Sequence, residues 1–157
     1  MVDVVHRPAT HADADALADS MREADRAEVV AMGLDVRAAA HHSIEASIEA
    51  FATDFDGSLA CMWGVSPGKA FLGGGTLGGP VVGWLLTTTV VDAHPRAFWR
   101  ESKHVAAALL QRWGTLANLV DVRHTRALSW LAGLGGVFGA EVQFGAAPFR
   151  CVTLRRR

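Results

Sequence analysis

The sequence predicts an α/β domain built around one mixed sheet, and three observations favour this class. Residues 11–48 carry apolar side chains at helical spacing, whereas the apolar residues after position 50 alternate with a period of two. The dipeptide Asp56-Gly57 separates two such alternating runs, as a hairpin turn would. The run 81–91 is apolar and rich in β-branched residues, which is typical of a strand covered on both faces. Helical and strand patterns therefore follow one another in the order expected of an α/β layout.

The N-terminal half is predicted to contain a strand, three helices and a hairpin. These elements are a strand at 2–7, helices at 10–21, 22–32 and 36–48, and strands at 51–55 and 59–65. Thr10 is expected to cap the first helix in a capping box with Asp13. Asp35 is a suitable cap for the third helix, on which Ile44 and Ile48 share one face.

The C-terminal half is predicted to begin with the central strand of the sheet. Its elements are that strand at 81–91, a long helix at 96–113, a buried strand at 116–122, a short helix at 125–131, and closing strands at 137–144 and 149–154. Gly114 is expected to end the long helix. With 157 residues, the chain has the size of one domain, predicted to span residues 1–157.

Composition excludes several classes of protein. The chain has 15 Lys and Arg against 16 Asp and Glu, so its surface is not that of a nucleic-acid-binding protein. Hydrophobic residues make up 50% and charged residues 20%, which argues against disorder, and the apolar runs are too short to span a bilayer. Cys61 and Cys151 lie in apolar stretches without zinc-ligand spacing, so we expect two buried thiols and residence in a reducing cytosol.

Two motifs that could indicate a site favour ordinary structural roles. The segment 73–78 matches G-x-G-x-x-G, but a proline and a strand follow it where a dinucleotide site needs a helix, so a hairpin loop is expected. His41 and His42 are neighbours on a predicted helix and point about 100° apart, so they cannot hold one metal ion from one face. No metal site is predicted.

Residues 5–17 (VHRPATHADADAL) resemble the start of the GNAT superfamily of acetyl-CoA-dependent acyltransferases. Residues 124–131 and 134–136 are similar to the fourth helix of that superfamily and to the glycine after it. The resemblance covers nearly the whole chain. It implies a single-domain GNAT-like α/β fold with a mixed, mostly antiparallel central sheet flanked by helices.

A narrower resemblance is to the small GNAT-like virion or virion-assembly proteins of short-tailed phages of the T-seven type. The matching segments are 24–33, 98–100, 115–118, 130–138 and 149–154. This resemblance implies a phage-encoded protein located in the host cytoplasm, in the virion, or in both. Its partners would be phage structural proteins or host proteins, and neither nucleic acid nor a membrane span is expected. Whether the chain forms a homodimer stays open.

Two departures from the superfamily pattern bear on catalysis. Active members cradle the coenzyme pyrophosphate in a glycine-rich turn, yet no glycine occurs between Trp84 and Trp113. Placing that turn on residues 95–103 puts Glu101 near the phosphates, where its charge opposes binding. The superfamily's usual acid is a tyrosine whose position falls on Leu131, and the chain has no tyrosine. The leading hypothesis is therefore a GNAT-like assembly protein without standard acetyl-CoA chemistry, for which no cofactor is expected and no catalytic residue is assigned.

The alternative hypothesis is an active acyltransferase with a rebuilt site and acetyl-CoA as its cofactor. In this version the backbone of the central strand would orient the thioester, an arginine would bind phosphate, and a histidine or water would handle protons. The residues concerned are Leu86, Thr87 and Thr88 on the strand, Arg96 and Arg100 for phosphate, and Trp99 and His124 as pocket candidates. A third class is a host-directed binding module.

Overall fold

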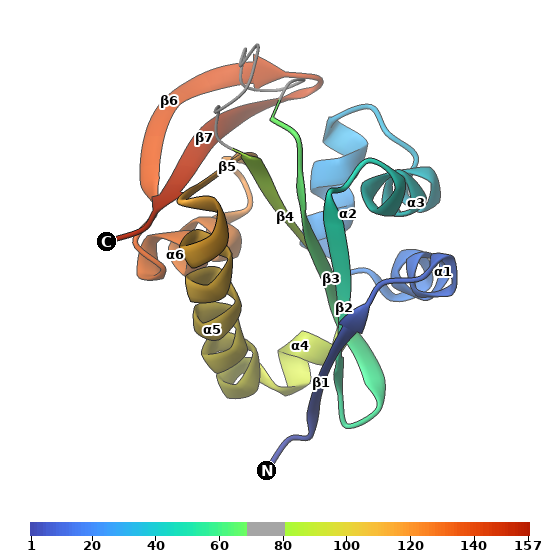
Figure 1. Cartoon of the computed structure of the whole chain (residues 1–157). Helices are drawn as coiled ribbons and strands as arrows, with labels where there is room; N and C mark the ends of the chain where they lie inside the picture. The colour runs from blue at the N-terminus through green and yellow to red at the C-terminus, as the bar shows by residue number, and fades with distance from the viewer. Residues whose placement is uncertain (69–80) are drawn as a thin grey trace.

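A computed structural model describes residues 1–68 and 81–157 of the chain. Within these residues, seven strands form one sheet in the order β1-β2-β3-β4-β5-β7-β6 (Figure 1). The strands are β1 (Val4–Pro8), β2 (Glu49–Phe55), β3 (Ser58–Ser66), β4 (Val81–Thr87), β5 (Thr115–Asp121), β6 (Val137–Phe144) and β7 (Ala147–Arg155). The helices are α1 (His11–Ser20), α2 (Glu23–Ala31), α3 (Val36–Glu45), α4 (Val90–Ala93), α5 (Pro95–Trp113) and α6 (Thr125–Gly133). The predicted α/β class with a mixed, mostly antiparallel sheet is confirmed.

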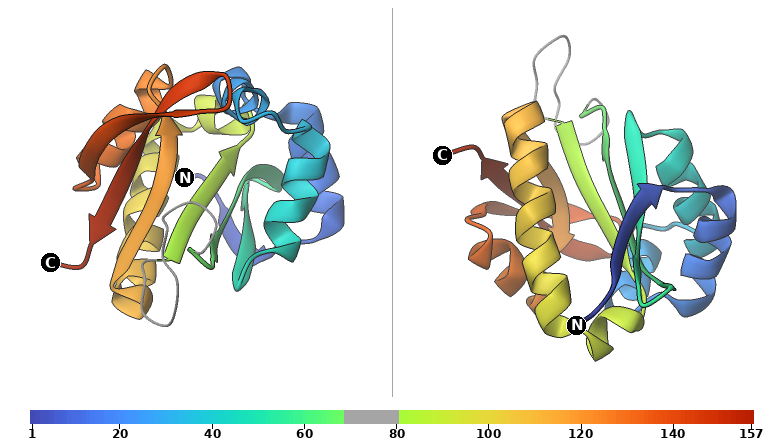
Figure 2. Two further views of the ribbon diagram at one scale, coloured as in Figure 1. Left: turned by 90° about the horizontal axis from the view of Figure 1, so that it is seen from above. Right: turned by 60° about the horizontal axis from the view of Figure 1, so that its bottom comes forward.

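The sheet is divided at its centre. All neighbouring strands pair antiparallel except β4 and β5, which pair parallel. The register of this parallel pair consists of Val81 with Leu116 and Val82 with Ala117, and beyond these residues the strands diverge (Figure 2). Helices α1, α2 and α3 lie on one face of the sheet, and α5 and α6 lie on the other. The divergence of β4 and β5 is the feature that positions the candidate site.

The predicted cap of α1 is part of a wider ionic network. The Thr10 side chain accepts from the Asp13 backbone N–H, and the Asp13 carboxylate accepts from the Thr10 backbone N–H at 2.8 Å, which confirms the capping box. Arg7 on β1 donates to both Asp13 oxygens, at 2.7 and 2.8 Å, and its Nε donates to Asp54 on β2. This network joins β1, α1 and β2. The predicted cap of α3 is confirmed as well, since Asp35 accepts from the Ala38 N–H at 2.9 Å.

Two predicted elements end earlier than the sequence indicates. The central strand, expected to reach Val91, ends at Thr87, because the Thr88 hydroxyl accepts from the Val90 N–H and the chain turns into α4. The third helix, expected to include Ile48, ends at Glu45. The Ile48 N–H donates to Val65 on β3 instead, so the chain is already extended at this position. A hydroxyl contact ends the strand and pairing with β3 ends the helix, although the apolar pattern continues in both elements.

Several smaller expectations also change. Pro8, expected to close the first strand, is its last residue and pairs with Phe51 from the edge of the sheet, where a missing N–H is tolerated. The last strand begins at Ala147, so the turn before it is shorter than predicted. Cys61 is buried, as expected, whereas Cys151 is only half-buried. The glycine-rich segment 73–78 lies outside the described residues.

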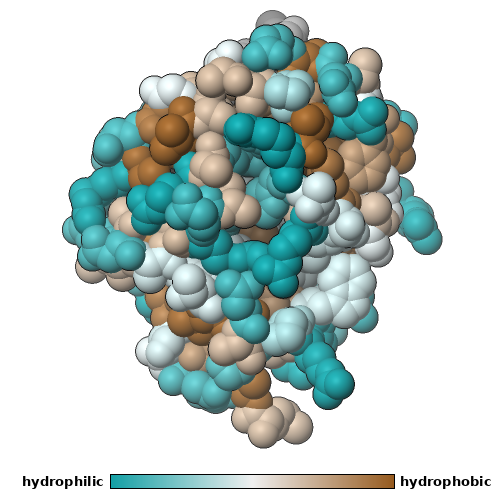
Figure 3. Space-filling view, turned by 180° about the vertical axis from the view of Figure 1, so that it is seen from behind, coloured by the Kyte–Doolittle hydropathy of each residue, from teal (hydrophilic) through white to brown (hydrophobic). Residues whose placement is uncertain are grey.

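The surface mixes polar and apolar side chains. Figure 3 shows hydrophobic groups interspersed among hydrophilic ones on the face seen from behind Figure 1. In the described part of the chain, no helix has the length and hydropathy required to cross a membrane.

Candidate functional site

A cavity of about 360 Å³ occupies the space where β4 and β5 diverge. Its volume falls in the range of small-molecule sites, roughly 300–1,000 Å³. Much of the wall is apolar and comes from the strands and from the helices α5 and α6, including Trp84, Leu109, Leu116 and Trp130. Ionisable side chains also line it, so the cavity combines an apolar body with a polar region.

Asp25 on α2 is the centre of this polar region. Its Oδ1 accepts from the His124 Nε2 at 2.8 Å, and its Oδ2 accepts from the Thr87 backbone N–H at 2.8 Å and from the Thr87 hydroxyl. The side chains of Asp25 and His124 are only 11% and 8% exposed. The hydrogen bond to Asp25 raises the pKa of His124 above its usual value. One carboxylate thus connects α2 with the end of β4 and the start of α6.

Glu28 lies one turn after Asp25 on α2 and also lines the cavity. Its Oε2 accepts from the Asp121 backbone N–H at 3.1 Å. Burial raises the pKa of Glu28 to about 7, because the cavity wall disfavours the charged form. Glu28 is therefore a carboxyl group that can gain or lose a proton near neutral pH.

We expect Glu28→Gln to be more stable than the parent chain at pH 8, by up to about 3 kcal/mol. The pKa of Glu28 is higher in the folded state than in the unfolded state, so the folded state binds the extra proton between pH 4.5 and about 7. Stability contributed by this group is complete below pH 4.5 and is lost as the pH rises through 7. Glutamine stays neutral and keeps an oxygen for the Asp121 N–H. Urea unfolding of both proteins at pH 5 and pH 8 measures the difference.

The matched control is Glu23→Gln, because Glu23 is an exposed residue on the same helix. Its stability relative to the parent chain should change little between the two pH values. Equal pH profiles for Glu28→Gln and the parent chain would contradict the assigned burial of this charge.

The structure brings three of the sequence-predicted site residues to the cavity. Thr87, Trp99 and His124 all line it. Leu86 and Thr88 are not among the cavity-lining residues. Leu86 packs against the core formed with α1 and α3, and the Thr88 hydroxyl donates to the Leu59 carbonyl at 2.7 Å.

The two predicted phosphate ligands are placed elsewhere. Arg96 and Arg100 are exposed at the start of α5 and are not among the cavity-lining residues. The Nε of Arg100 donates to Glu101 at 2.9 Å, so this guanidinium already has an anionic partner. The placement of the coenzyme turn on residues 95–103 was wrong, because this segment is the first half of helix α5, which begins with Pro95 as its first residue.

The segment that does connect β4 to α5, residues 88–94, fits a coenzyme pyrophosphate poorly. Such a cradle needs free backbone N–H groups, yet most amides here donate within the protein. The bonds are Thr88 to Ala60 O (2.9 Å), Thr89 to Ser20 O (3.1 Å), Val90 to Thr88 Oγ1 (3.2 Å), Val91 to Thr88 O (3.3 Å), Asp92 to Thr89 O (3.1 Å) and His94 to Val91 O (3.2 Å). Pro95 has no N–H to add. The six amides named here therefore already have acceptors within the protein.

Aromatic side chains fill the contact between α5 and α6. Phe98 stacks on Trp130 with ring centroids 5.9 Å apart. Trp99 lies so close to Gly133 that an added Cβ there would be 2.7 Å from the indole. Leu131 lines the cavity as an apolar side chain. Among the residues that the structure describes, no group of three or more His, Cys, Asp or Glu is arranged to hold a metal ion.

Sequence reasoning missed Asp25 and Glu28. Both lie on an amphipathic helix, where acidic residues at i and i+3 usually face solvent, and Asp25 is 99 positions from its partner His124. One signal in the sequence could have indicated them: the apolar residues of this helix are all alanine or valine. Only the folded chain shows that this helix turns two carboxyl groups toward the cavity.

Comparison with known proteins supports the fold. No protein-family model and no curated protein matches the sequence. Among solved structures, YncA of Salmonella typhimurium with its cofactor acetyl-CoA is similar with a TM-score of 0.64 at 12% identity, over 97% of this chain and 93% of that one. The aminoglycoside acetyltransferase AAC(6')-Ib in complex with coenzyme A gives 0.69 at 15% identity, over 98% and 95%. A GNAT-family acetyltransferase from Bacillus anthracis gives 0.68 at 8% identity, over 99% and 96%. The chain therefore has the GNAT acetyltransferase fold.

Proposed function

We propose that this chain is a GNAT-superfamily, phage-encoded protein that acts in particle assembly through protein contacts and carries no standard acetyl-CoA chemistry. The single observation that carries the chemical part is the use of the backbone amides between β4 and α5 by the protein itself. A pyrophosphate would have to displace these hydrogen bonds, and the segment contains no glycine that would permit close approach.

A second observation, at the last residue of β4, supports the same conclusion. The Thr87 N–H, part of the backbone expected to orient a thioester, donates to Asp25 at 2.8 Å. Leu131 has no proton to donate to a leaving group. The assembly role is supported by the resemblance of residues 24–33, 98–100, 115–118, 130–138 and 149–154 to the virion-assembly proteins of short-tailed phages.

Calorimetric titration with acetyl-CoA tests the chemical part. We expect no saturable heat at coenzyme concentrations that saturate AAC(6')-Ib, which serves as the positive control in the same buffer. Micromolar binding together with acetyl transfer to any amine would refute this part of the proposal.

Mass spectrometry of purified particles tests the assembly part. We expect peptides of this chain to be enriched in virions over the infected-cell lysate, or in assembly intermediates isolated from that lysate. If the chain were found only outside particles, and a pull-down from host lysate recovered a host protein with it, the host-directed binding module would be supported instead.

An acyltransferase with a rebuilt site is the second candidate, and the polar region of the cavity favours it. Glu28 has a pKa of about 7, His124 is held by Asp25, and the Trp130 indole N–H is buried without a hydrogen-bond partner in the described residues. These groups could bind a polar ligand and accept a proton. Acyl transfer that the parent chain performs and Glu28→Gln does not would establish this candidate.

A further inference from the structure

The exposed charges of the chain are separated between its two halves. Among residues 1–68, seven acidic side chains and one basic side chain are exposed, whereas residues 81–157 expose nine basic and two acidic side chains. Helices α1, α2 and α3 lie on one face of the sheet, and α5 and α6 lie on the other (Figure 1, Figure 2). Most of the acidic charge and most of the basic charge therefore lie on opposite faces. The net charge of -1 for the whole chain hides this separation.

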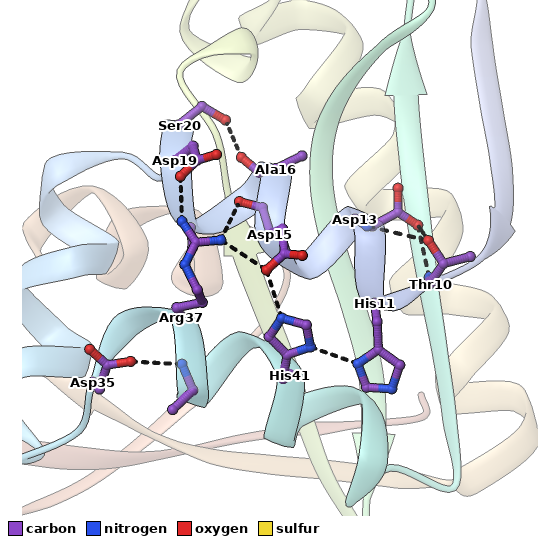
Figure 4. A network of polar contacts seen from close by, with 12 residues as sticks. Thr10, His11, Asp13, Asp15, Ala16, Asp19, Ser20, Asp35, Arg37 and His41 are labelled. Carbon is purple, nitrogen blue, oxygen red and sulfur yellow. Dashed lines mark hydrogen bonds and ion pairs between the residues drawn. The ribbon is translucent and has the colours of Figure 1, made fainter.

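The face formed by α1, α2 and α3 is acidic and has few cations of its own. Arg37, the one exposed basic side chain among residues 1–68, donates to Asp15 at 2.8 Å and also to Asp19 (Figure 4). The His41 Nε2 is 2.8 Å from Asp15 as well, and its Nδ1 is 2.6 Å from the Nδ1 of His11. The remaining exposed carboxylates leave this face negative, so it repels a polyanion.

Helix α5, on the other face, presents a row of basic side chains to solvent. Arg96, Arg100 and Lys103 are exposed and are spaced i, i+4 and i+7, so they share one side of the helix over about 10 Å. The one acidic residue of α5, Glu101, is only 16% exposed. Arg96 lies in the first turn, where the helix dipole favours acidic side chains, and α5 has none there. Helix stability therefore does not explain this row.

The cations of this row can meet a further anion. Within the residues that the structure describes, Arg96 and Lys103 form no ion pair, and the Lys103 ammonium lies 5.5 Å from the centroid of the Trp99 ring. Arg100 donates to Glu101 through its Nε, which leaves its terminal nitrogens for another acceptor. The row thus keeps most of its capacity to bind an anion.

A second group of arginines lies where α5 and α6 end. Arg155, Arg156 and Arg157 are all exposed. The Arg156 N–H donates to the Gly114 carbonyl just after α5, and the Arg157 guanidinium lies beside Gly135, just after α6. In the described part of the chain these three arginines form no ion pair. Positive charge is therefore present at both ends of α5.

We propose that the basic face, formed by Arg96, Arg100, Lys103 and residues 155–157, binds the phosphate backbone of nucleic acid. All of its cations except Lys103 are arginines, whose planar guanidinium groups suit phosphate. The centre of a protein interface is usually apolar, but the exposed large hydrophobic residues of the described chain all lie outside α5, α6 and residues 155–157. Backbone binding needs charge alone and does not depend on base sequence.

The charge separation also determines how the chain approaches a polyanion. The acidic face lies on the opposite side of the sheet and points away from the bound phosphates, so one orientation is favoured. This binding does not rest on the assembly role. A chain found only outside particles would still bind nucleic acid through the basic face.

Fluorescence anisotropy of a labelled DNA duplex of about 30 base pairs, titrated with the full chain at about 50 mM NaCl, tests the proposal. We expect saturable binding with a dissociation constant in the micromolar range, and the same value for a second duplex of unrelated sequence. Between 50 and 200 mM NaCl the affinity should fall about 100-fold or more, as expected when about four phosphates are neutralised.

Arg100→Gln and Arg37→Gln are matched variants, because both arginines are 48% exposed, both pair with a carboxylate, and each change removes one charge. Arg100→Gln should weaken DNA binding at least about threefold and lower the salt slope by about one. Arg37→Gln, on the acidic face, should leave both unchanged. Changing Arg155, Arg156 and Arg157 together to glutamine should weaken binding more than Arg100→Gln does.

Thermal unfolding confirms that every variant is folded. The proposal is overturned if the parent chain shows no saturable binding at about 50 mM NaCl, or if Arg37→Gln weakens binding as much as Arg100→Gln. It is also overturned if poly-glutamate or phosphatidylserine vesicles bind as tightly as DNA at equal charge, because the basic face would then recognise an acidic protein or a membrane.

Discussion

Asp25→Ala is expected to destabilise the folded chain by about 3–5 kcal/mol, as the loss of one partner of a buried pair usually does. The variant leaves the His124 Nε2 and the Thr87 N–H without their acceptor, both at sites where water has little access. An unpaired buried donor costs its full desolvation energy. Urea unfolding at pH 7, followed by tryptophan fluorescence, measures the change in free energy of unfolding.

Asp92→Ala is the control for this prediction. Asp92 is 43% exposed and pairs with Arg22 at 3.4 Å and Arg126 at 3.2 Å near the same cavity. Exposed ion pairs are worth about 0–1 kcal/mol, so this change should be small. If Asp25→Ala cost no more than Asp92→Ala, Asp25 would not hold the end of β4 and the start of α6 together as the geometry indicates.

Phe149→Ala is expected to cost about 3–5 kcal/mol, which is the usual range for removing a fully buried phenylalanine. Phe149 is completely inaccessible and packs with Ala31, Leu119 and Ala147. Its ring also meets Phe144 edge-to-face, with centroids 5.7 Å apart. The truncation leaves a cavity between the end of α2 and the hairpin of β6 and β7. Thermal and urea unfolding should both show the loss.

Val137→Ala on β6 is the comparison for Phe149→Ala. Val137 is 66% exposed, so its truncation should change the free energy of unfolding by no more than about 0.5 kcal/mol. A similar cost for both variants would mean that Phe149 is not part of the continuous core between α2 and the last two strands.

Local chemistry explains which parts of the fold could be predicted. The Thr10 and Asp13 capping box, the Asp35 cap and the Asp56-Gly57 turn each depend on residues within three positions of one another. All are present in the structure. The end of the central strand could not be predicted from its apolar run. It depends on the Thr88 hydroxyl and on pairing with β3. Both are contacts between residues that lie far apart in the sequence.

The candidate site could be predicted only in part. Thr87, Trp99 and His124, which the resemblance to the superfamily suggested, line the cavity. Asp25 and Glu28 could not be found, because their burial depends on how α2 packs rather than on residues near them in the chain. The same limit applies to His11 and His41, whose contact depends on the antiparallel packing of two helices.

Helix α2 connects the two halves of the divided sheet. The halves β1–β4 and β5–β7 share only two residue pairs, so few backbone hydrogen bonds connect them. Three successive turns of α2 make further connections: Asp25 to His124, Glu28 to the Asp121 N–H, and the Ala31 carbonyl to the Ala146 N–H. Helix α2 thus adds three hydrogen bonds to the contact that the apolar cluster of Val65, Leu116 and Leu154 makes between the two halves. Loss of these hydrogen bonds would weaken the contact along the cavity, while the strand pairs within each half stay intact.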